Sequence, residues 1–181
     1  MDIDAKSARA SLADIDSIVA RLKQSSFYRS ASTLIILWGG LVAFGYVACY
    51  LLPRQAPSIW IAVNIVGVLA TLAIGLQYRR AGMAFDWRIV IAIFLFFGFG
   101  LICSRLGHFG GREYNAFWPI LFMFGYALAG LWLGRVFVLL GVSIAALTFA
   151  GYLWVERWFE LYLAVVDGGG LVLAGLWMRR A

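Results

Sequence analysis

Six long apolar stretches follow one another along the chain, separated by short polar or basic segments. They are Thr33–Leu52, Ile59–Tyr78, Ile89–Ser104, Tyr114–Gly134, Val136–Val155 and Leu161–Met178. About 20 apolar residues in an α-helix cross the ~30 Å hydrocarbon core of a bilayer. Backbone polar groups in lipid have to be paired within the segment, which favours helices. The pattern therefore predicts an all-α, polytopic membrane protein with six transmembrane helices.

Three of these stretches end in a similar way. Leu128–Trp132 and Leu173–Trp177 are the same pentapeptide, LAGLW, and arginine follows each copy three residues later. Gly75–Tyr78 is a looser copy that also precedes arginine. The six spans therefore group into helical hairpins that repeat in parallel, because each hairpin begins and ends on the same side. The predicted hairpins are 33–80, 87–135 and 136–180. A parallel repeat differs from the inverted repeats of many carriers.

The composition supports a membrane protein and the basic residues predict its orientation. The chain is 64% hydrophobic and only 13% charged, whereas soluble domains carry about 25% charged residues. With six spans, eleven of the fifteen Lys and Arg residues fall on the side of both termini. An excess of basic residues marks the cytoplasmic side, so both termini are predicted to be cytoplasmic. This topology also accounts for the net charge of +6, and it gives no reason to expect a nucleic-acid partner. The lipid bilayer is the expected surrounding.

The first thirty residues differ from the rest, so we divide the chain into a lead-in, 1–30, and a transmembrane domain, 31–181. Within the lead-in, Ile15, Ile18, Val19 and Leu22 follow the spacing of one apolar helix face. An amphipathic cytoplasmic helix is predicted here. Such a short helix cannot form a core of its own. It lies on the membrane surface or packs on the protein's own loops, or it binds a dedicated partner.

Small residues recur at helical spacing inside the spans. Lipid tails give helices no hydrophobic reason to associate, so small side chains that allow close backbone approach mark contact faces. The predicted helix-packing positions are Gly67, Gly75, Gly130, Gly134, Gly170 and Gly175. The same faces suit contacts within the chain, a homo-oligomer or another membrane protein.

Asp167 is the acidic residue that lies deep in an apolar stretch, close to the middle of the last span. A charge at the bilayer centre costs at least ~2.5–3.5 kcal/mol on insertion scales, and a neutral, protonated carboxyl avoids most of this cost. Gly168, Gly169 and Gly170 follow it and weaken the helix. Two interpretations are open: a hydrogen bond that fixes helix packing, or a site for a proton or cation. The candidate partners of the carboxyl are Asn64, Tyr46, Tyr126 and Tyr152.

A second candidate site lies in the longest turn on the other side of the membrane. Arg105, His108 and Arg112 gather there. A solvated loop is one interpretation, and an anionic headgroup or solute held by the two arginines is the alternative. One histidine without a second His or a Cys neighbour does not indicate a metal site. We expect no cofactor, and no nucleophile–base set or nucleotide-binding motif points to catalysis.

In its hairpin period, its glycine placement and its length, the chain resembles small six-span inner-membrane proteins of bacteria. Acid-stress membrane proteins of the HdeD type have this overall shape. The resemblance covers the six spans and implies a multi-pass protein of the bacterial inner membrane, with no functional residue carried over. Two functions are predicted: a non-enzymatic protein that acts through helix or partner contacts, with a structural, regulatory or stress-related role, and a small conduit for protons, cations or a solute centred on Asp167.

Overall fold

A computed structural model describes residues 29–80 and 87–180 of the chain. The predicted amphipathic helix of the lead-in lies outside these residues. Within them, 93% of the residues are helical and there is no strand. The all-α class predicted from the sequence is therefore confirmed.

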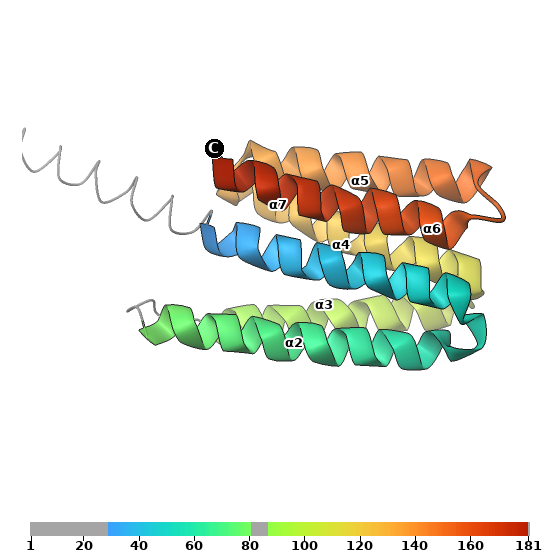
Figure 1. The fold of residues 1–181 in the computed structure, drawn as a ribbon, viewed down its shortest axis with the longest axis horizontal. Coiled ribbons are helices and arrows are strands. Elements are labelled where there is room, and N and C mark those ends of the chain that lie inside the picture. Colours follow the sequence, from blue (N-terminus) through green and yellow to red (C-terminus); the bar gives the residue numbers. More distant parts are fainter. Residues whose placement is uncertain (1–28, 81–86, 181) are drawn as a thin grey trace, which may run out of the picture.

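Long helices run back and forth along one axis (Figure 1). The described residues begin with a first helix at Arg29–Leu51. In chain order there follow η1 (Pro53–Gln55), α2 (Ala56–Arg80), α3 (Trp87–Leu106), α4 (Gly111–Leu133) and α5 (Arg135–Trp154). The chain closes with α6 (Phe159–Leu163), the π-helix η2 (Ala164–Gly169) and α7 (Gly170–Arg180). These last three elements form one continuous helical segment, which we call the last span (Phe159–Arg180).

Five of the described helices are long and apolar enough to cross a membrane. They are the first helix, the segment Pro53–Gln77, α4, α5 and the last span. The apolar part of α3, Val90–Leu106, is shorter. Thus a helix covers each of the six predicted stretches, and a membrane-spanning length is established for five.

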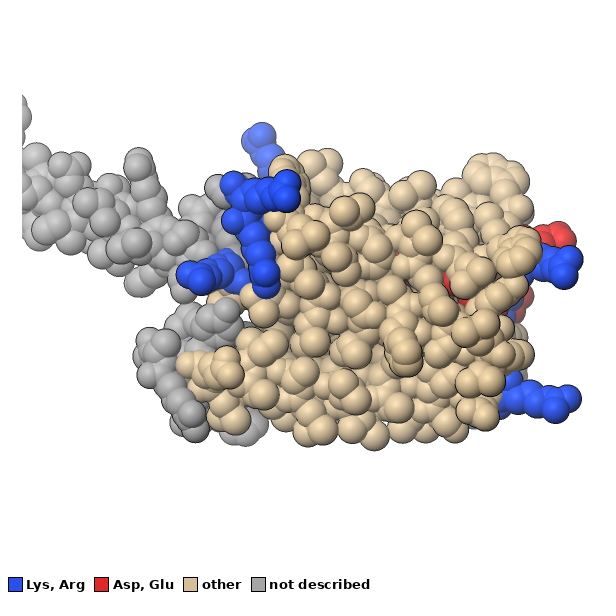
Figure 2. Space-filling model, in the orientation of Figure 1, with Lys and Arg blue, Asp and Glu red and all other residues tan. Residues whose placement is uncertain are grey.

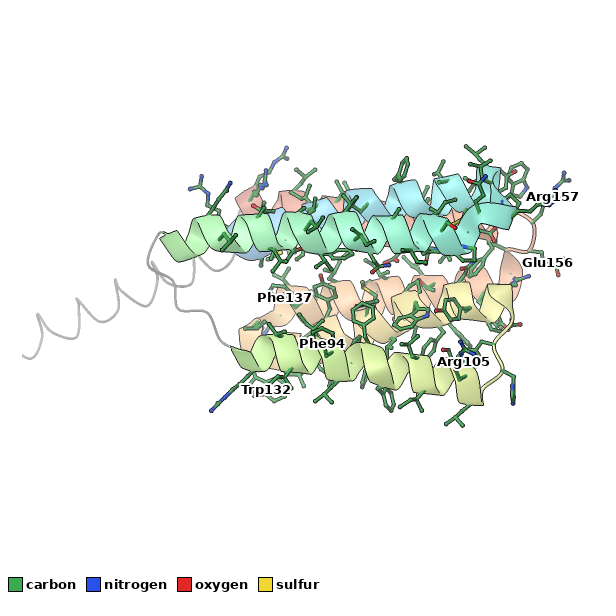
Figure 3. All side chains as sticks on the ribbon, turned by 90° about the horizontal axis from the view of Figure 1, so that it is seen from below. Phe94, Arg105, Trp132, Phe137, Glu156 and Arg157 are labelled. Carbon is green, nitrogen blue, oxygen red and sulfur yellow. The ribbon has the colours of Figure 1, made fainter. Side chains whose placement is uncertain are left out.

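Charged side chains separate to the two ends of the bundle. Figure 2 shows Lys and Arg gathered at the end where α7 stops, some charges of both signs at the other end, and an uncharged surface between them. We call the first the C-terminal end and the second the loop end. In Figure 3, Arg105, Glu156 and Arg157 lie at the loop end, whereas Trp132 and Phe137 lie toward the C-terminal end. An uncharged band between charged rims is what a bilayer requires.

The helices are not equally buried. In the most apolar stretch of the last span, 39% of the residues are buried. In the most apolar stretch of Pro53–Gln77, the buried share is 11%. The first helix, α4, α5 and the last span enclose the interior, and α2 and α3 lie outside them (Figure 1). The interior is therefore formed by four of the six helical segments.

Glycine residues allow the backbones of these four helices to approach one another closely. A Cβ on Gly141 of α5 would stand 2.6 Å from the backbone nitrogen of Ala127, and one on Gly130 of α4 would stand 2.5 Å from that of Val138. The tight connection between the two helices is Gly134, whose φ of 137° disfavours residues with a side chain. The α4–α5 pair is consequently a closely packed hairpin.

Candidate functional site

Asp167 lies in the π-helix η2, in the middle of the last span. Its side chain is only 4% exposed. The Oδ1 atom is buried and has no hydrogen-bond partner among the described residues. A buried polar atom without a partner costs about 1–3 kcal/mol, and more if it is charged. Such an atom calls for an explanation beyond packing.

The π-helical turn lies against the first helix at the residue that follows Asp167. Asp167 is followed by Gly168, and a Cβ on that glycine would stand 2.6 Å from the backbone nitrogen of Ala43. The first helix returns the contact at Gly39, where a Cβ would stand 2.8 Å from the Gly168 carbonyl oxygen. The sequence predicted a helix weakened by glycines but not its π form. The π-helix occurs mostly as single turns inside α-helices, and these are frequent at functional sites.

Two of the predicted partners, both tyrosines, lie within electrostatic range of Asp167. Tyr46 of the first helix and Tyr126 of α4 both lie close enough to the carboxyl to interact with it electrostatically. Side chains on helices lean toward the N-terminus of their own helix. The first helix starts at the C-terminal end and α4 starts at the loop end, so the two tyrosines lean in opposite directions along the bundle.

Thr148 of α5 is a buried polar residue that the sequence did not indicate. Its side chain is 0% exposed, and its hydroxyl has no partner among the described residues. On the same helix, Gly151 lies against Tyr162, and Ile144 lies against Gly170. Because Thr148 comes between these two contacts, it lies at the level of η2. A threonine in an apolar helix carries no sequence signal that would single it out.

Apolar residues close the interior on both sides of this polar level. Toward the C-terminal end lies a cluster formed by Ile35, Met123, Phe137, Ile144, Leu171 and Met178. Toward the loop end lies a second cluster, formed by Tyr46, Ala116, Phe159, Leu163 and Ala164. The polar side chains of Asp167 and Thr148 belong to neither cluster. The carboxyl is therefore enclosed between two apolar layers.

The other two predicted partners of Asp167 lie elsewhere in the bundle. Asn64 of α2 donates its side-chain amide to the carbonyl oxygen of Trp60 in its own helix, at 2.8 Å. Tyr152 of α5 faces Arg112, whose Cζ lies 5.3 Å from the centre of the ring. Of the four partners that the sequence suggested, Tyr46 and Tyr126 lie within electrostatic range of Asp167. The Tyr46 hydroxyl itself donates to the backbone carbonyl oxygen of Asn115 at 3.3 Å.

Arg105, His108 and Arg112 do not form one cluster. Arg105 and His108 are exposed, and His108 has a left-handed φ of 49°. Arg112 turns inward and donates from Nη2 to the carbonyl oxygens of Tyr152 at 2.6 Å and Val155 at 2.8 Å. These carbonyls close the end of α5, where a cation is favourable. Arg112 therefore ties α4 to α5.

The predicted packing glycines have different surroundings. A Cβ on Gly67 would meet the ring of Trp38 at 2.6 Å. A Cβ on Gly130, Gly170 or Gly175 would likewise meet atoms of a neighbouring helix within 3.0 Å. Gly75 has open space around it, and Gly134 forms the turn described above.

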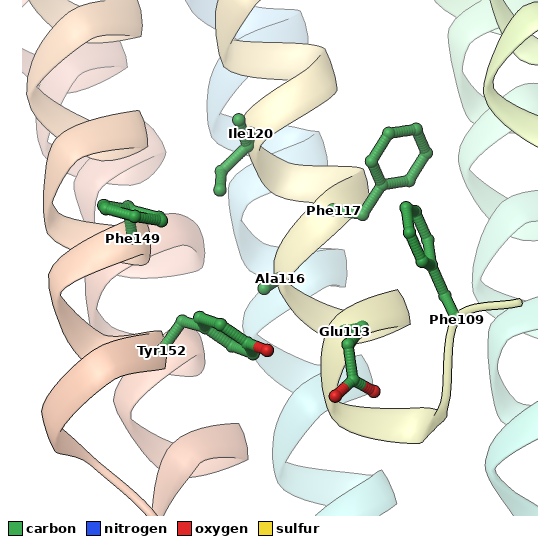
Figure 4. A pocket seen from close by; sticks show the side chains of 7 residues that line it. All are labelled: Phe109, Glu113, Ala116, Phe117, Ile120, Phe149 and Tyr152. Atoms are coloured by element: carbon green, nitrogen blue, oxygen red, sulfur yellow. The ribbon is translucent and has the colours of Figure 1, made fainter. Parts of the chain in front are cut away.

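A shallow apolar groove opens between α4 and α5 near the loop end. Figure 4 shows its lining, with Phe149 and Tyr152 of α5 on one side and Glu113, Ala116 and Ile120 of α4 on the other. Phe109 and Phe117 complete it. Within the described residues, no group of three or more His, Cys, Asp or Glu side chains could hold a metal ion.

Comparisons with protein-family models, with curated proteins and with solved structures found no match to this chain. The resemblance to HdeD-type proteins accordingly stays a prediction.

Proposed function

We propose that this chain is a six-span protein of the bacterial inner membrane with both termini in the cytoplasm. Five spans have the necessary length, and the apolar part of α3 is the proposed sixth. The described arginines support the orientation. Seven of them lie at helix ends of the C-terminal end and four at the loop end: Arg29, Arg79, Arg80, Arg88, Arg135, Arg179 and Arg180 against Arg54, Arg105, Arg112 and Arg157. An excess of Lys and Arg is the signature of a cytoplasmic face.

Within this membrane protein, we propose that Asp167 is a proton-binding site, and that the protein is a non-enzymatic conduit for protons. The observation that carries the proposal is the buried Oδ1 without a partner among the described residues. A carboxyl whose role is to fix helix packing would have both oxygens paired, because an unpaired one destabilises the fold. Intramembrane carboxyls of this kind are typical of proton relays.

A proton fits the site better than a metal cation. Ca²⁺ takes six to eight oxygen ligands and Mg²⁺ six. Around Asp167 the identified polar atoms are the Thr148 hydroxyl and the phenols of Tyr46 and Tyr126, which are too few. A proton needs a single oxygen.

The test compares proton flux through liposomes that hold the full chain or Asp167→Asn. We expect flux with the full chain and loss of at least about tenfold in the variant, since a carboxamide cannot exchange a proton in this range. Glu156→Gln, a carboxyl at the loop end, serves as the matched control and should conduct as the full chain does. Equal flux with and without the Asp167 carboxyl, in variants of equal folded yield, would contradict the proposal.

A second candidate function is association through helix contacts. Its support is the exposed apolar surface of α2 and α3, which includes Leu69, Leu72, Phe94, Leu95 and Phe99. Lipid, a second copy or another membrane protein could cover this surface. Crosslinking in native membranes tests it: deletion of residues 1–28 should abolish a specific crosslinked product. If the full chain yields no crosslinked product, this second function is wrong.

A further inference from the structure

The groove between α4 and α5 combines aromatic rings with a carboxylate. Phe109, Phe117, Phe149 and Tyr152 supply the rings, and Glu113 is the charged residue among those that line it (Figure 4). The groove has a volume of about 230 Å³. Pockets for drug-sized ligands measure about 300–1,000 Å³. This groove therefore suits a small head group and a short length of chain.

One face of α4 forms the first wall of the groove. Glu113, Ala116, Phe117 and Ile120 follow the i, i+3, i+4, i+7 spacing that places residues on one side of a helix. Ala116 is buried and small, so it leaves space that its larger neighbours enclose. Because α4 starts at the loop end, the carboxylate lies at that end and Ile120 lies about 10 Å further along the bundle.

Phe149 and Tyr152 of α5 form the opposite wall. They are three residues apart, so their rings share one face of the helix, and Figure 4 shows Tyr152 pointing from α5 toward α4. Arg112 holds the loop end of this wall, since its Cζ lies 5.3 Å from the centre of the Tyr152 ring. Its Nη2 also donates to the Tyr152 carbonyl oxygen at 2.6 Å. The Tyr152 ring is therefore held in position and already interacts with one cation.

The Glu113 carboxylate is available to a ligand. Its neighbour in the chain, Arg112, donates instead to carbonyl oxygens at the end of α5. The Glu113 side chain is exposed and turns back over the start of α4, where a Cβ on Gly110 would stand 2.7 Å from Oε2. The helix dipole favours a negative charge in this first turn. The groove thus offers a negative charge beside aromatic rings.

We propose that this groove binds an amphipathic organic cation, with a quaternary ammonium head group at Glu113 and Tyr152 and an alkyl chain along Ile120 and Phe149. Aromatic rings attract such head groups through their π faces, and the carboxylate supplies the opposite charge. A primary ammonium has three N–H donors to satisfy, whereas a quaternary ammonium has none, which suits a lining with few acceptors. The inference does not depend on the proposed role of Asp167.

A free organic cation fits the groove better than the head group of a phospholipid. A phospholipid carries a phosphate next to its ammonium group, and this phosphate would lie near the Glu113 carboxylate. The described residues that line the groove include no Lys, Arg or His to compensate a second negative charge, and like charges repel. The charge of the lining therefore selects a ligand that is positive and carries no phosphate.

The experiment measures binding of radiolabelled hexyltrimethylammonium by equilibrium dialysis, with the full chain in lipid nanodiscs and empty nanodiscs of the same lipid as the blank. The short chain limits partition of the probe into lipid. We expect saturable binding above the blank. The uncharged isostere, in which carbon replaces the nitrogen, should compete at least about tenfold more weakly, because the rings attract the cation. Hexylphosphocholine, which carries a phosphate, should also compete more weakly.

Two pairs of variants locate the binding site. Glu113→Gln keeps the size of the side chain and removes its charge, and it should weaken binding about fivefold. Glu156→Gln, at the same end of the bundle, is its control. Phe149→Leu removes one ring and should weaken binding about threefold. Its control is Phe124→Leu, since Phe124 is 56% exposed and Phe149 is 55% exposed. All four side chains are exposed, so we expect every variant to fold, and both controls should bind as the full chain does.

Three results would overturn the inference. If the uncharged isostere competes as well as the probe itself, the groove only accepts apolar groups. If hexylphosphocholine competes as well as the probe, the groove is a lipid site. If Glu113→Gln and Phe149→Leu bind as tightly as their controls, the cation binds elsewhere on the chain.

Discussion

The first helix contacts two neighbours in different ways. Against the last span it presents Gly39 and Ala43, and the two backbones come into direct contact at Gly168. Against α2 it presents the ring of Trp38, which covers Gly67 and donates from its indole nitrogen to Thr71 at 3.1 Å. The first contact brings the two backbones together, whereas the second holds the helices one aromatic ring apart.

The difference between these two contacts explains why the buried carboxyl of Asp167 lies beside the first one. Direct backbone contact between small residues maximises van der Waals packing and fixes the spacing of two helices in lipid. Asp167 lies beside that contact and is enclosed. The α2 contact depends on large side chains, and α2 itself remains mostly exposed. A rigid inner bundle with a peripheral helix pair is the arrangement that results.

The most severe way to break the inner contact is Gly168→Leu. The new side chain would start 2.6 Å from the backbone of Ala43, and overpacking in a closed core costs typically 1–3 kcal/mol, with about 3 kcal/mol expected here because backbone has to move. Thermal unfolding in detergent measures the loss. Gly75→Leu is the matched control, since nothing lies within 4 Å of Gly75. Equal destabilisation of both variants would contradict the close contact.

The next largest effect is expected from Arg112→Met. This change removes two charge-assisted hydrogen bonds to the carbonyl oxygens of Tyr152 and Val155 and should lower the unfolding free energy by about 2 kcal/mol. Arg105→Met alters an exposed arginine at the same end and should leave the unfolding midpoint unchanged. Denaturant titration of both variants checks the difference. A midpoint shift in Arg105→Met as large as that in Arg112→Met would remove the distinction between them.

The smallest effects are expected when one hydroxyl is removed from each contact, that with the last span and that with α2. Ser32→Ala removes the buried hydroxyl that bonds to Gly175 and accepts from Arg179, and we expect a loss of about 1 kcal/mol. Thr71→Val removes the acceptor of Trp38 in the α2 contact and should cost about 0.6 kcal/mol, the average for such bonds in membranes. The same unfolding assay ranks them. If Thr71→Val proves the more damaging, the α2 contact is the stronger one.

Part of the candidate site could be predicted from the chain alone. Asp167 stands out in the sequence because a carboxyl in an apolar stretch is costly, and Tyr46 and Tyr126 were among its predicted partners. Asn64 was also predicted but bonds to Trp60 within α2. Nothing local distinguishes these cases, because the partner of a side chain depends on which helix lies beside it.

The same limit applies at the loop end. Arg105, His108 and Arg112 are close in sequence, but Arg112 begins a helix and turns toward the end of α5. Asn115 and Glu160 are 45 residues apart and no spacing rule connects them. The sequence therefore predicted one site from three residues that are merely close in the chain. It did not predict the contact between Asn115 and Glu160, which only the packing of the helices brings about.

The sequence by itself indicated a lipid surrounding, the all-α class, and the position of Asp167 deep in the last apolar stretch. Those follow from the length of apolar runs and from the cost of leaving a backbone group or a charge unpaired in lipid. The tertiary structure alone decided that the last span contains a π turn, that its glycines meet the first helix, and that Oδ1 of Asp167 is left without a partner among the described residues. Glycine permits close approach at many positions, and only the packed helices select which of them are used.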